Sequence, residues 1–176
     1  MKELVLGCGN YKKKRIFYNE DKEYKNPVFV DIDPNSKANI IFDLNKITKV
    51  CNRLPFEDNE FDEIHAYDVL EHIGKQGDIK GFFNEWGEYY RVLKPGGRFF
   101  ISCPRFDSKW AWGDPGHTRI ISIDTFVFLD QDEYKKQVGV TQISDYRYLW
   151  QGNFKLIEYY PGGGNDSDSY VLECIK

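Results

Sequence analysis

The stretch LVLGCGN at residues 4–10, followed by VFVDIDP at residues 28–34, decides the fold. The first is a short apolar run that ends in a Gly-x-Gly turn, and the second is an apolar run that ends in an acid, Asp31. Because glycine lacks Cβ, Gly7 and Gly9 allow a tight turn and a close approach of the backbone to a ligand. An acid about 20 residues further on can accept hydrogen bonds from both hydroxyls of a ribose. The pair predicts an α/β fold that binds an adenosine-type ligand at the carboxyl ends of its strands.

The bulk composition is that of a single globular domain. The chain has 176 residues, of which 41% are hydrophobic and 16% aromatic, enough for one packed core. Its net charge of −4 argues against a general nucleic-acid binder. No apolar run approaches the length of a membrane span, and the run at residues 4–7 is too short for a signal peptide. We expect a cytoplasmic protein with no nucleic-acid or membrane partner, and the pattern defines no oligomeric state.

Cysteine and histidine spacing predicts neither a disulfide framework nor a metal site. The cysteines are far apart and form no C-x-x-C pair, which is typical of a reduced cytosolic chain. The histidines also lack the spacing of metal ligands. These residues are Cys8, Cys51, Cys103 and Cys174, with His65, His72 and His117.

Apolar runs separated by turn residues predict the order of the elements. Strands are expected at Glu3–Leu6, Pro27–Asp31, Ile40–Phe42, Asp62–Tyr67 and Arg98–Cys103. Helical spacing of apolar residues over Ile79–Leu93, stopped by KPGG at 94–97, indicates a crossover to a new parallel strand.

The chain ends with two strand-like runs, Phe154–Tyr160 and Tyr170–Ile175, joined by PGGGN at 161–165. No helix fits between them, so they should be antiparallel neighbours. We therefore expect a doubly wound, mostly parallel α/β sheet that closes with an antiparallel C-terminal hairpin.

Five ordered blocks resemble the class I S-adenosylmethionine-dependent methyltransferases, in particular the small type 11-like members. LGCGN at 6–10 is similar to the first motif, VDID at 30–33 to the ribose-binding motif, and FDL at 42–44 with LPFEDNEFD at 54–62 to the third. VLEHI at 69–73 and YRVLKPGG at 90–97 are similar to the segments after strand four and before strand five. The resemblance covers residues 3–104 and the terminal hairpin. It implies a Rossmann-like, seven-stranded sheet and one S-adenosylmethionine-binding domain over residues 1–176.

The resemblance also implies roles for residues at the cofactor. The first-motif residues would lie against the methionine half, Asp31 would hold the ribose hydroxyls, and apolar side chains would pack on adenine. Asp43 would receive the adenine amino group, although an acid in this position is also an ordinary helix N-cap. The cofactor-binding residues would be Gly7, Cys8, Gly9, Asp31, Ile32, Asp43, Leu44, Asp68 and Val69.

The chain departs from the family pattern between residues 11 and 26. Tyr11 and Lys12 stand where a third glycine is expected, and the segment shows no helical stripe, so the usual first helix is expected to be missing or distorted. The basic run KKKR at 12–15 is typical of a solvated turn, with an anion site as the alternative. Since no N-terminal helices precede the first strand, we expect the lid or substrate segment at 104–140.

The run KWAWGDPGHTR at 109–119 is the candidate acceptor site. Trp110 and Trp112 would supply apolar walls, and Arg119 a polar handle. His117 and Asp114 are the candidate catalytic residues, with His117 as the base if the acceptor must lose a proton. His72 is a weaker substrate-site candidate, and its neighbour Glu71 is similar. The alternative is structural, with DPG at 114–116 making a turn and Arg119 pairing with an acid.

These observations predict S-adenosylmethionine-dependent methyl transfer to a small or medium-sized acceptor, by O- or N-methylation. Two alternatives remain. One is an NAD-dependent oxidoreductase, which the missing glycine at Lys12 disfavours. The other is a non-catalytic S-adenosylmethionine-binding subunit or sensor.

Overall fold

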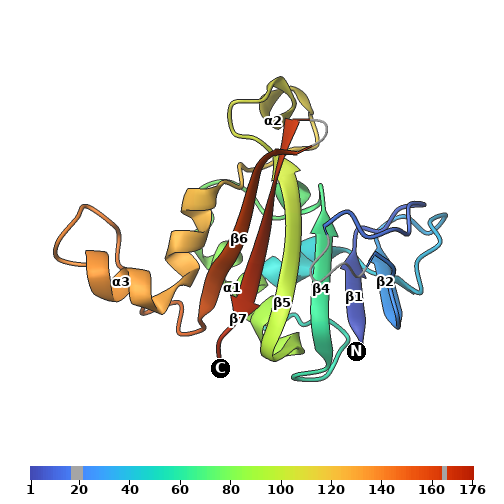
Figure 1. The fold of residues 1–176 in the computed structure, drawn as a ribbon, viewed down its shortest axis with the longest axis horizontal. Coiled ribbons are helices and arrows are strands. Elements are labelled where there is room, and N and C mark those ends of the chain that lie inside the picture. The colour runs from blue at the N-terminus through green and yellow to red at the C-terminus, as the bar shows by residue number, and fades with distance from the viewer. Residues whose placement is uncertain (17–21, 164–165) are drawn as a thin grey trace.

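The computed structural model describes residues 1–16, 22–163 and 166–176, which form one mixed sheet with helices packed on it (Figure 1). The strands are β1 (Glu3–Leu6), β2 (Pro27–Asp31), β3 (Ile40–Ile41), β4 (Phe61–Tyr67), β5 (Leu93–Pro104), β6 (Phe154–Gly163) and β7 (Ser167–Cys174). The α-helices are α1 (Ile79–Val92), α2 (Lys109–Gly113) and α3 (Gln131–Gln137), and the 3-10 helices are η1 (Leu44–Thr48), η2 (Leu70–His72) and η3 (Ile123–Leu129).

The seven strands lie in the order β3-β2-β1-β4-β5-β7-β6. All pairs from β3 to β5 are parallel, whereas β7 runs antiparallel to both β5 and β6. The chain leaves β3 at one edge and returns to β4 beside β1, so the direction of winding changes between β1 and β4. In sheets of this kind ligands bind at that point, beyond the carboxyl ends of the strands. The predicted mostly parallel sheet with an antiparallel terminal hairpin is confirmed.

The last three strands differ most from the sequence pattern. Strand β5 begins five residues before the predicted Arg98 and includes the KPGG run, because Leu93 already pairs with Phe61 of β4, and β6 ends three residues after the predicted Tyr160. Strands β1 and β2 begin and end where predicted, and α1 ends one residue early.

Strand β7 begins at Ser167, three residues before the apolar run, because its polar first residues pair with the end of β5: Pro104 faces Ser167, and Cys103 faces Asp168. The hairpin therefore reaches the ligand end of the sheet.

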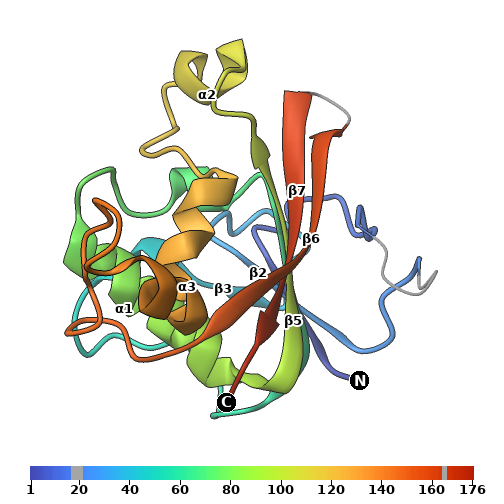
Figure 2. The same cartoon turned by 60° about the vertical axis from the view of Figure 1, so that its left-hand side comes forward.

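The described helices α1, η3 and α3 cover one face of the sheet (Figure 2). Helix α1 buries the apolar side that its spacing predicts. Trp86 and Tyr89 are fully buried, and their rings lie 5.6 and 5.1 Å from the ring of Phe99 in β5. Removing a buried aromatic ring of this kind costs about 3–5 kcal/mol of stability, so this contact anchors α1 to the middle of the sheet.

The opposite face of β1 and β4 is closed by a buried ionic cluster rather than by a described helix. Lys14 Nζ lies 2.7 Å from Glu3 Oε1 and 2.9 Å from Glu63 Oε2. His65 Nε2 lies 3.0 Å from the same Glu63 oxygen, and its Nδ1 lies 2.8 Å from the hydroxyl of Tyr67. We call these five residues the Lys14 cluster; four of them are at most 8% exposed and Glu63 is 9% exposed.

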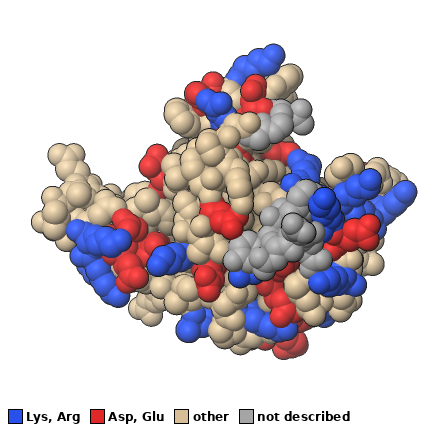
Figure 3. Space-filling model, in the orientation of Figure 1, with Lys and Arg blue, Asp and Glu red and all other residues tan. Residues whose placement is uncertain are grey.

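The Lys14 cluster corrects the interpretation of the basic run KKKR at 12–15 as a solvated turn. Lys14 is 6% exposed and neutralises two carboxylates, so this part of the run is neither solvated nor an anion site. The face of the molecule seen in Figure 3 carries basic and acidic side chains next to each other rather than one continuous basic field.

The segment after β5, expected as a long unassigned loop, contains a short helix. Helix α2 stands beyond the carboxyl end of β5 and the adjacent amino end of β7 (Figures 1 and 2). Ser108 caps it, because its hydroxyl accepts a hydrogen bond from the Trp110 N–H at 3.1 Å. The chain then returns through η3 and α3 to the helical face, so within residues 104–140 only the part before η3 lies at the ligand end of the sheet.

Candidate functional site

The glycine turn after β1 has the backbone that its sequence predicts. Gly7 and Gly9 have φ of +57° and +49°, a region that side chains with a Cβ rarely adopt. A Cβ on Gly7 would lie 2.4 Å from a methyl of Val69, so this position also needs glycine for space. At Gly9 nothing lies within 4 Å of such an atom. At Gly7 the turn therefore packs against Val69, the N-cap of η2, whereas at Gly9 it is open. Cys8, between the two glycines, is 6% exposed.

Asp31 joins the end of β2 to this turn. Its Oδ2 accepts a hydrogen bond from the Gly9 N–H at 2.6 Å, and its Oδ1 accepts one from the Asp33 N–H at 2.9 Å. The side chain is buried, since the residue is 8% exposed. A carboxylate offers about four acceptor positions, so two remain for a diol such as that of a ribose.

Two apolar residues, Ile32 and Leu44, directly follow the acids Asp31 and Asp43. Ile32 is 62% exposed directly after β2, whereas Leu44 is buried at the start of η1. Asp43 precedes that helix, and its Oδ1 accepts a hydrogen bond from the Asn45 N–H at 2.9 Å. The N-cap alternative for Asp43 is therefore observed. Its Oδ2 bonds to no other described residue and is available for an amino group.

Asp68 follows β4 with φ of +56° and lies at the ligand end of the sheet, beside β5 and β7. Its Oδ1 accepts a hydrogen bond from the Ser102 hydroxyl at 3.2 Å, and its Oδ2 forms an ion pair with Arg15. A cavity of about 420 Å³ lies here, lined by Asp68, Pro104, Trp110, Asp166 and Ser167. Arg15 was not among the predicted site residues, because nothing local in the KKKR run distinguishes the residue that reaches Asp68.

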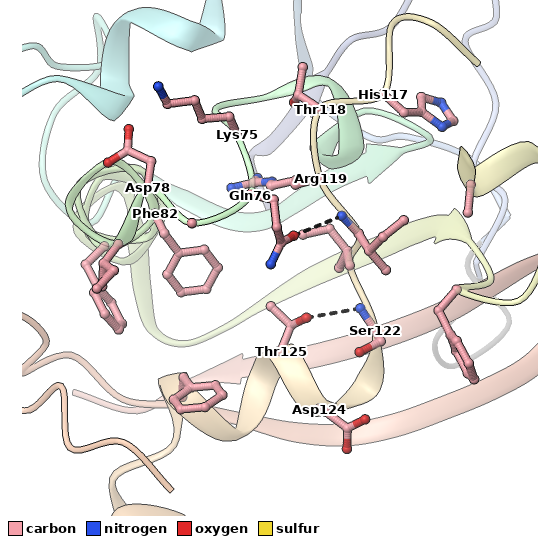
Figure 4. A pocket seen from close by; sticks show the side chains of 18 of the residues that line it. Lys75, Gln76, Asp78, Phe82, His117, Thr118, Arg119, Ser122, Asp124 and Thr125 are labelled. Carbon is pink, nitrogen blue, oxygen red and sulfur yellow. Dashed lines mark hydrogen bonds between the residues drawn. The ribbon is translucent and has the colours of Figure 1, made fainter. Parts of the chain in front are cut away.

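A larger cavity of about 830 Å³ lies on the helical side of the same edge (Figure 4). Its wall is held by hydrogen bonds from the Ile120 N–H to Gln76 Oε1 at 3.3 Å and from the Ser122 N–H to Thr125 Oγ1 at 3.0 Å. Six of its 20 lining residues have large aromatic side chains: Phe82, Phe83, Phe106, Trp112, Phe128 and Tyr146. The cavity suits an apolar or flat molecule.

The two tryptophans of α2 line different cavities. Trp112 borders the larger cavity and Trp110 the smaller one, and both are more than half exposed. The structure therefore does not bring the two tryptophans to one cavity, and α2 lies between the two cavities.

Arg119 has the structural partner that the sequence alternative anticipated. Its guanidinium lies 2.7 Å from Glu85 Oε2 and donates to the Leu70 carbonyl at 2.8 Å. Arg119 is 6% exposed and Glu85 is fully buried. Although Arg119 borders the larger cavity, its charge is already compensated, so it holds the wall in place.

His117 and Asp114 come together with Glu71 and His72 at one end of the larger cavity. His117 Nε2 lies 3.8 Å from Asp114 Oδ2 and 4.0 Å from Glu71 Oε1, and its ring centre lies 4.6 Å from that of His72. Burial raises the pKa of the Glu71 carboxyl to about 7, and the charge of Asp68 adds to the shift. The burial of Glu71 depends on the distant segment at 114–119, so no local pattern indicates it.

Similarity to known proteins identifies the family of this chain. Residues 4–101, more than half of the chain, match the family model described as a methyltransferase domain. The chain belongs to this methyltransferase family. Its cofactor is S-adenosylmethionine, and the glycine turn, Asp31 and Ile32 fit the ligand: they offer open space beside Gly9, acceptors for a diol and an exposed apolar side chain.

An uncharacterized protein of Methanocaldococcus jannaschii is 31% identical to this methyltransferase-family chain over 105 residues, which make up 60% of this chain and 42% of that protein. The chain thus spans less than half of that relative. A SAM-dependent methyltransferase from Aquifex aeolicus has a TM-score of 0.56 at 14% identity, covering 99% of this chain and 82% of that one. The [4+2]-cyclase SpnF has a TM-score of 0.54 at 12% identity, covering 99% and 74%. These structures share the fold, and a fold by itself does not specify a reaction.

Among the described residues, no helix combines the length and the hydrophobicity that crossing a bilayer requires. The helices of this family member instead pack on the sheet or cover its ligand end.

Proposed function

We propose that the chain, as a single domain over residues 1–176, is an enzyme that transfers the methyl group of S-adenosylmethionine to an oxygen or nitrogen of a small or medium-sized acceptor. The acceptor occupies the larger cavity, and the segment at 104–140 covers it. The four cysteines are all free thiols, which supports a cytoplasmic location.

The observation that carries this proposal is the position of Asp31. A buried carboxylate at the end of β2 holds the Gly9 N–H at 2.6 Å and faces the open side of the glycine turn. This arrangement prepares acceptors for a ribose before any ligand arrives. The antiparallel pairing of β7 with β5 and the lysine at position 12 both favour S-adenosylmethionine over a nicotinamide dinucleotide.

The residues around the cavities supply alignment and exclusion of water. When bound, S-adenosylmethionine would supply a methyl group on a positively charged sulfur. The acceptor atom would bond to the methyl carbon in line with the carbon–sulfur bond that breaks, and S-adenosylhomocysteine would leave. Such a transfer mainly needs orientation and a dry site. Trp110 and Trp112 shield the two cavities from solvent. His117 and Asp114 orient the acceptor, and one of them takes its proton when the acceptor carries one.

The test is formation of S-adenosylhomocysteine by the purified chain across a panel of hydroxyl and amine acceptors. We expect His117→Ala and Asp114→Ala to lower turnover while their affinity for S-adenosylhomocysteine, measured by calorimetry, stays close to that of the wild type. Asp107→Asn is the matched control, because Asp107 is an exposed acid of the same segment that pairs with Arg105. Its turnover should be unchanged.

Two outcomes separate the parts of the proposal. Full turnover by both cavity variants would remove His117 and Asp114 from the reaction but leave the methyl transfer. Tight binding of S-adenosylhomocysteine without product from any acceptor would favour the non-catalytic binding protein.

A further inference from the structure

Three potential metal ligands meet at the His117 end of the larger cavity. Glu71 and His72 belong to η2, whereas His117 follows α2, 45 residues later in the chain. One carboxylate oxygen of Glu71 and one ring nitrogen of each histidine all lie within 4.8 Å of one another. Spacing along the sequence predicts no metal site, but the fold brings these residues together.

The backbone holds the two segments in this arrangement without help from a ligand. The Thr118 N–H donates to the Glu71 carbonyl at 2.9 Å, and the Gln76 N–H donates to the Thr118 carbonyl at 3.0 Å. The His117 ring lies at the edge of the cavity wall and points away from Phe82 (Figure 4). The group is therefore built into the fold, with the His117 imidazole at the edge of the cavity.

Glu71 is a buried carboxyl group without a bound counter-cation; its neighbours are the Cys103 thiol and, at 4.0 Å, the His117 ring nitrogen. The residue is 2% exposed, and neither of its side-chain oxygens has a hydrogen-bond partner among the described residues. The nearby guanidinium of Arg119 is bound by Glu85 on both of its terminal nitrogens. An uncompensated carboxylate is costly to bury, so this position favours binding of a cation.

The two histidines are also prepared for a ligand. His72 Nδ1 lies 3.0 Å from the Gly116 carbonyl oxygen, which orients the ring as backbone carbonyls orient the histidines of metal centres. His117 Nδ1 is buried and has no hydrogen-bond partner among the described residues. Both rings are thus fixed in place while part of their bonding capacity is unused.

We propose that Glu71, His72 and His117 bind one divalent transition-metal ion of the Zn²⁺ type. Two imidazoles and a carboxylate suit zinc and its neighbours, whereas magnesium and calcium prefer oxygen ligands alone. Ligand atoms about 2.0–2.2 Å from a tetrahedral ion lie about 3.3 Å apart, so inward shifts of roughly 1 Å from the present spacing complete the site. Three protein ligands leave one coordination position open at the edge of the cavity.

The other group of potential ligands in the described residues, Glu3, Glu63 and His65, already contains a cation. Lys14 Nζ lies within 2.9 Å of both carboxylates. No lysine is described within the group of Glu71, His72 and His117. We therefore place the ion in this group rather than in the Lys14 cluster.

Metal binding is measured on the whole purified chain after removal of metals by a chelator, so the test does not depend on methyl transfer. Zn²⁺ is titrated in competition with a chromophoric chelator, and Co²⁺ is used as a spectroscopic probe. We expect one Zn²⁺ per chain, visible Co²⁺ ligand-field bands, and no competition by excess Mg²⁺. Glu71→Gln, His72→Asn and His117→Asn should each weaken Zn²⁺ binding at least 10-fold, since even the partners that orient metal ligands contribute about 10–100-fold.

Asp124→Asn is the matched control, because Asp124 borders the same cavity but is not one of the three ligands. Its Zn²⁺ affinity should equal that of the wild type, and circular dichroism should show that every variant is folded. Absence of stoichiometric Zn²⁺ binding by the wild type overturns the proposal whatever the variants do. Unchanged binding by folded His72→Asn and His117→Asn would also overturn it, because the ion would then lie elsewhere.

Discussion

Replacing Asp31 with alanine removes the carboxylate that connects β2 to the glycine turn, and with it the acceptors proposed for the ribose. The Gly9 and Asp33 N–H groups, at 2.6 and 2.9 Å, then also lose their acceptor. A hydrogen bond to a charged group contributes about 1.5–3 kcal/mol. The affinity for S-adenosylhomocysteine should therefore fall about 10- to 150-fold.

Isothermal titration calorimetry of S-adenosylhomocysteine measures this loss directly. Asp33→Ala is the control, because Asp33 is an exposed acid two residues away whose Oδ1 accepts hydrogen bonds from the Asn35 backbone N–H at 2.8 Å and side-chain amide at 3.2 Å. It should change the affinity by no more than about twofold, or roughly 0.4 kcal/mol. Asp31→Asn keeps the shape but retains only one acceptor oxygen, so its loss should be intermediate.

Unchanged affinity in a folded Asp31→Ala variant would refute the assignment of the ribose to the end of β2. Tighter binding of NAD than of S-adenosylhomocysteine by the wild type would contradict the proposed choice of donor.

Three further predictions concern stability. Gly7→Ala should lower the unfolding free energy in urea by about 2–5 kcal/mol, because about 1–2 kcal/mol for the positive φ and about 1–3 kcal/mol for the contact at 2.4 Å add. Gly9→Ala, with open space, should lose only the backbone part of about 1–2 kcal/mol, and equal losses in the two variants would contradict the contact. Burial opposes the charge of Glu63, but hydrogen bonds from its histidine and lysine partners outweigh it and lower its pKa from 4.5 to about 2, so its contribution is present above pH 4.5 and lost as the pH falls toward 2. The stability advantage of the wild type over Glu63→Gln should shrink over that interval, and a constant advantage would contradict the shift. Arg119→Met leaves Glu85 buried without a cation and should cost about 3–5 kcal/mol in urea unfolding, with partial recovery in Arg119→Met/Glu85→Gln; a fully stable single variant would disprove the pairing.

Local sequence was sufficient wherever a single element determined the outcome. The runs at 3–6 and 27–31 are short, apolar and bounded by turn residues, so their strands could be assigned to the residue. The glycine turn and Asp31 followed from the same runs, because a positive φ and a strand-end acid are local properties. The antiparallel hairpin followed from the length of its connection.

Features that depend on distant partners could not be read in this way. The burial of Lys14 is determined by Glu63, 49 residues away, so a run of four basic residues looked solvated. The first residues of β7 are polar and are recruited by pairing with β5. Helix α2 had a local signal, the N-cap serine at position 108, which the surrounding tryptophans and glycines obscured.

The buried lysine of the Lys14 cluster also restricts which substitutions this chain can accept. Lys14 is the lysine that compensates both Glu3 and Glu63, and the two carboxylates lie on adjacent parallel strands in paired positions. A neutral residue at position 14 would leave two like charges facing each other in a buried space, while a neutral residue at either acid would remove only one of its counter-ions. Positions 3, 14 and 63 are therefore expected to change together among relatives, with the lysine the last of the three to be lost.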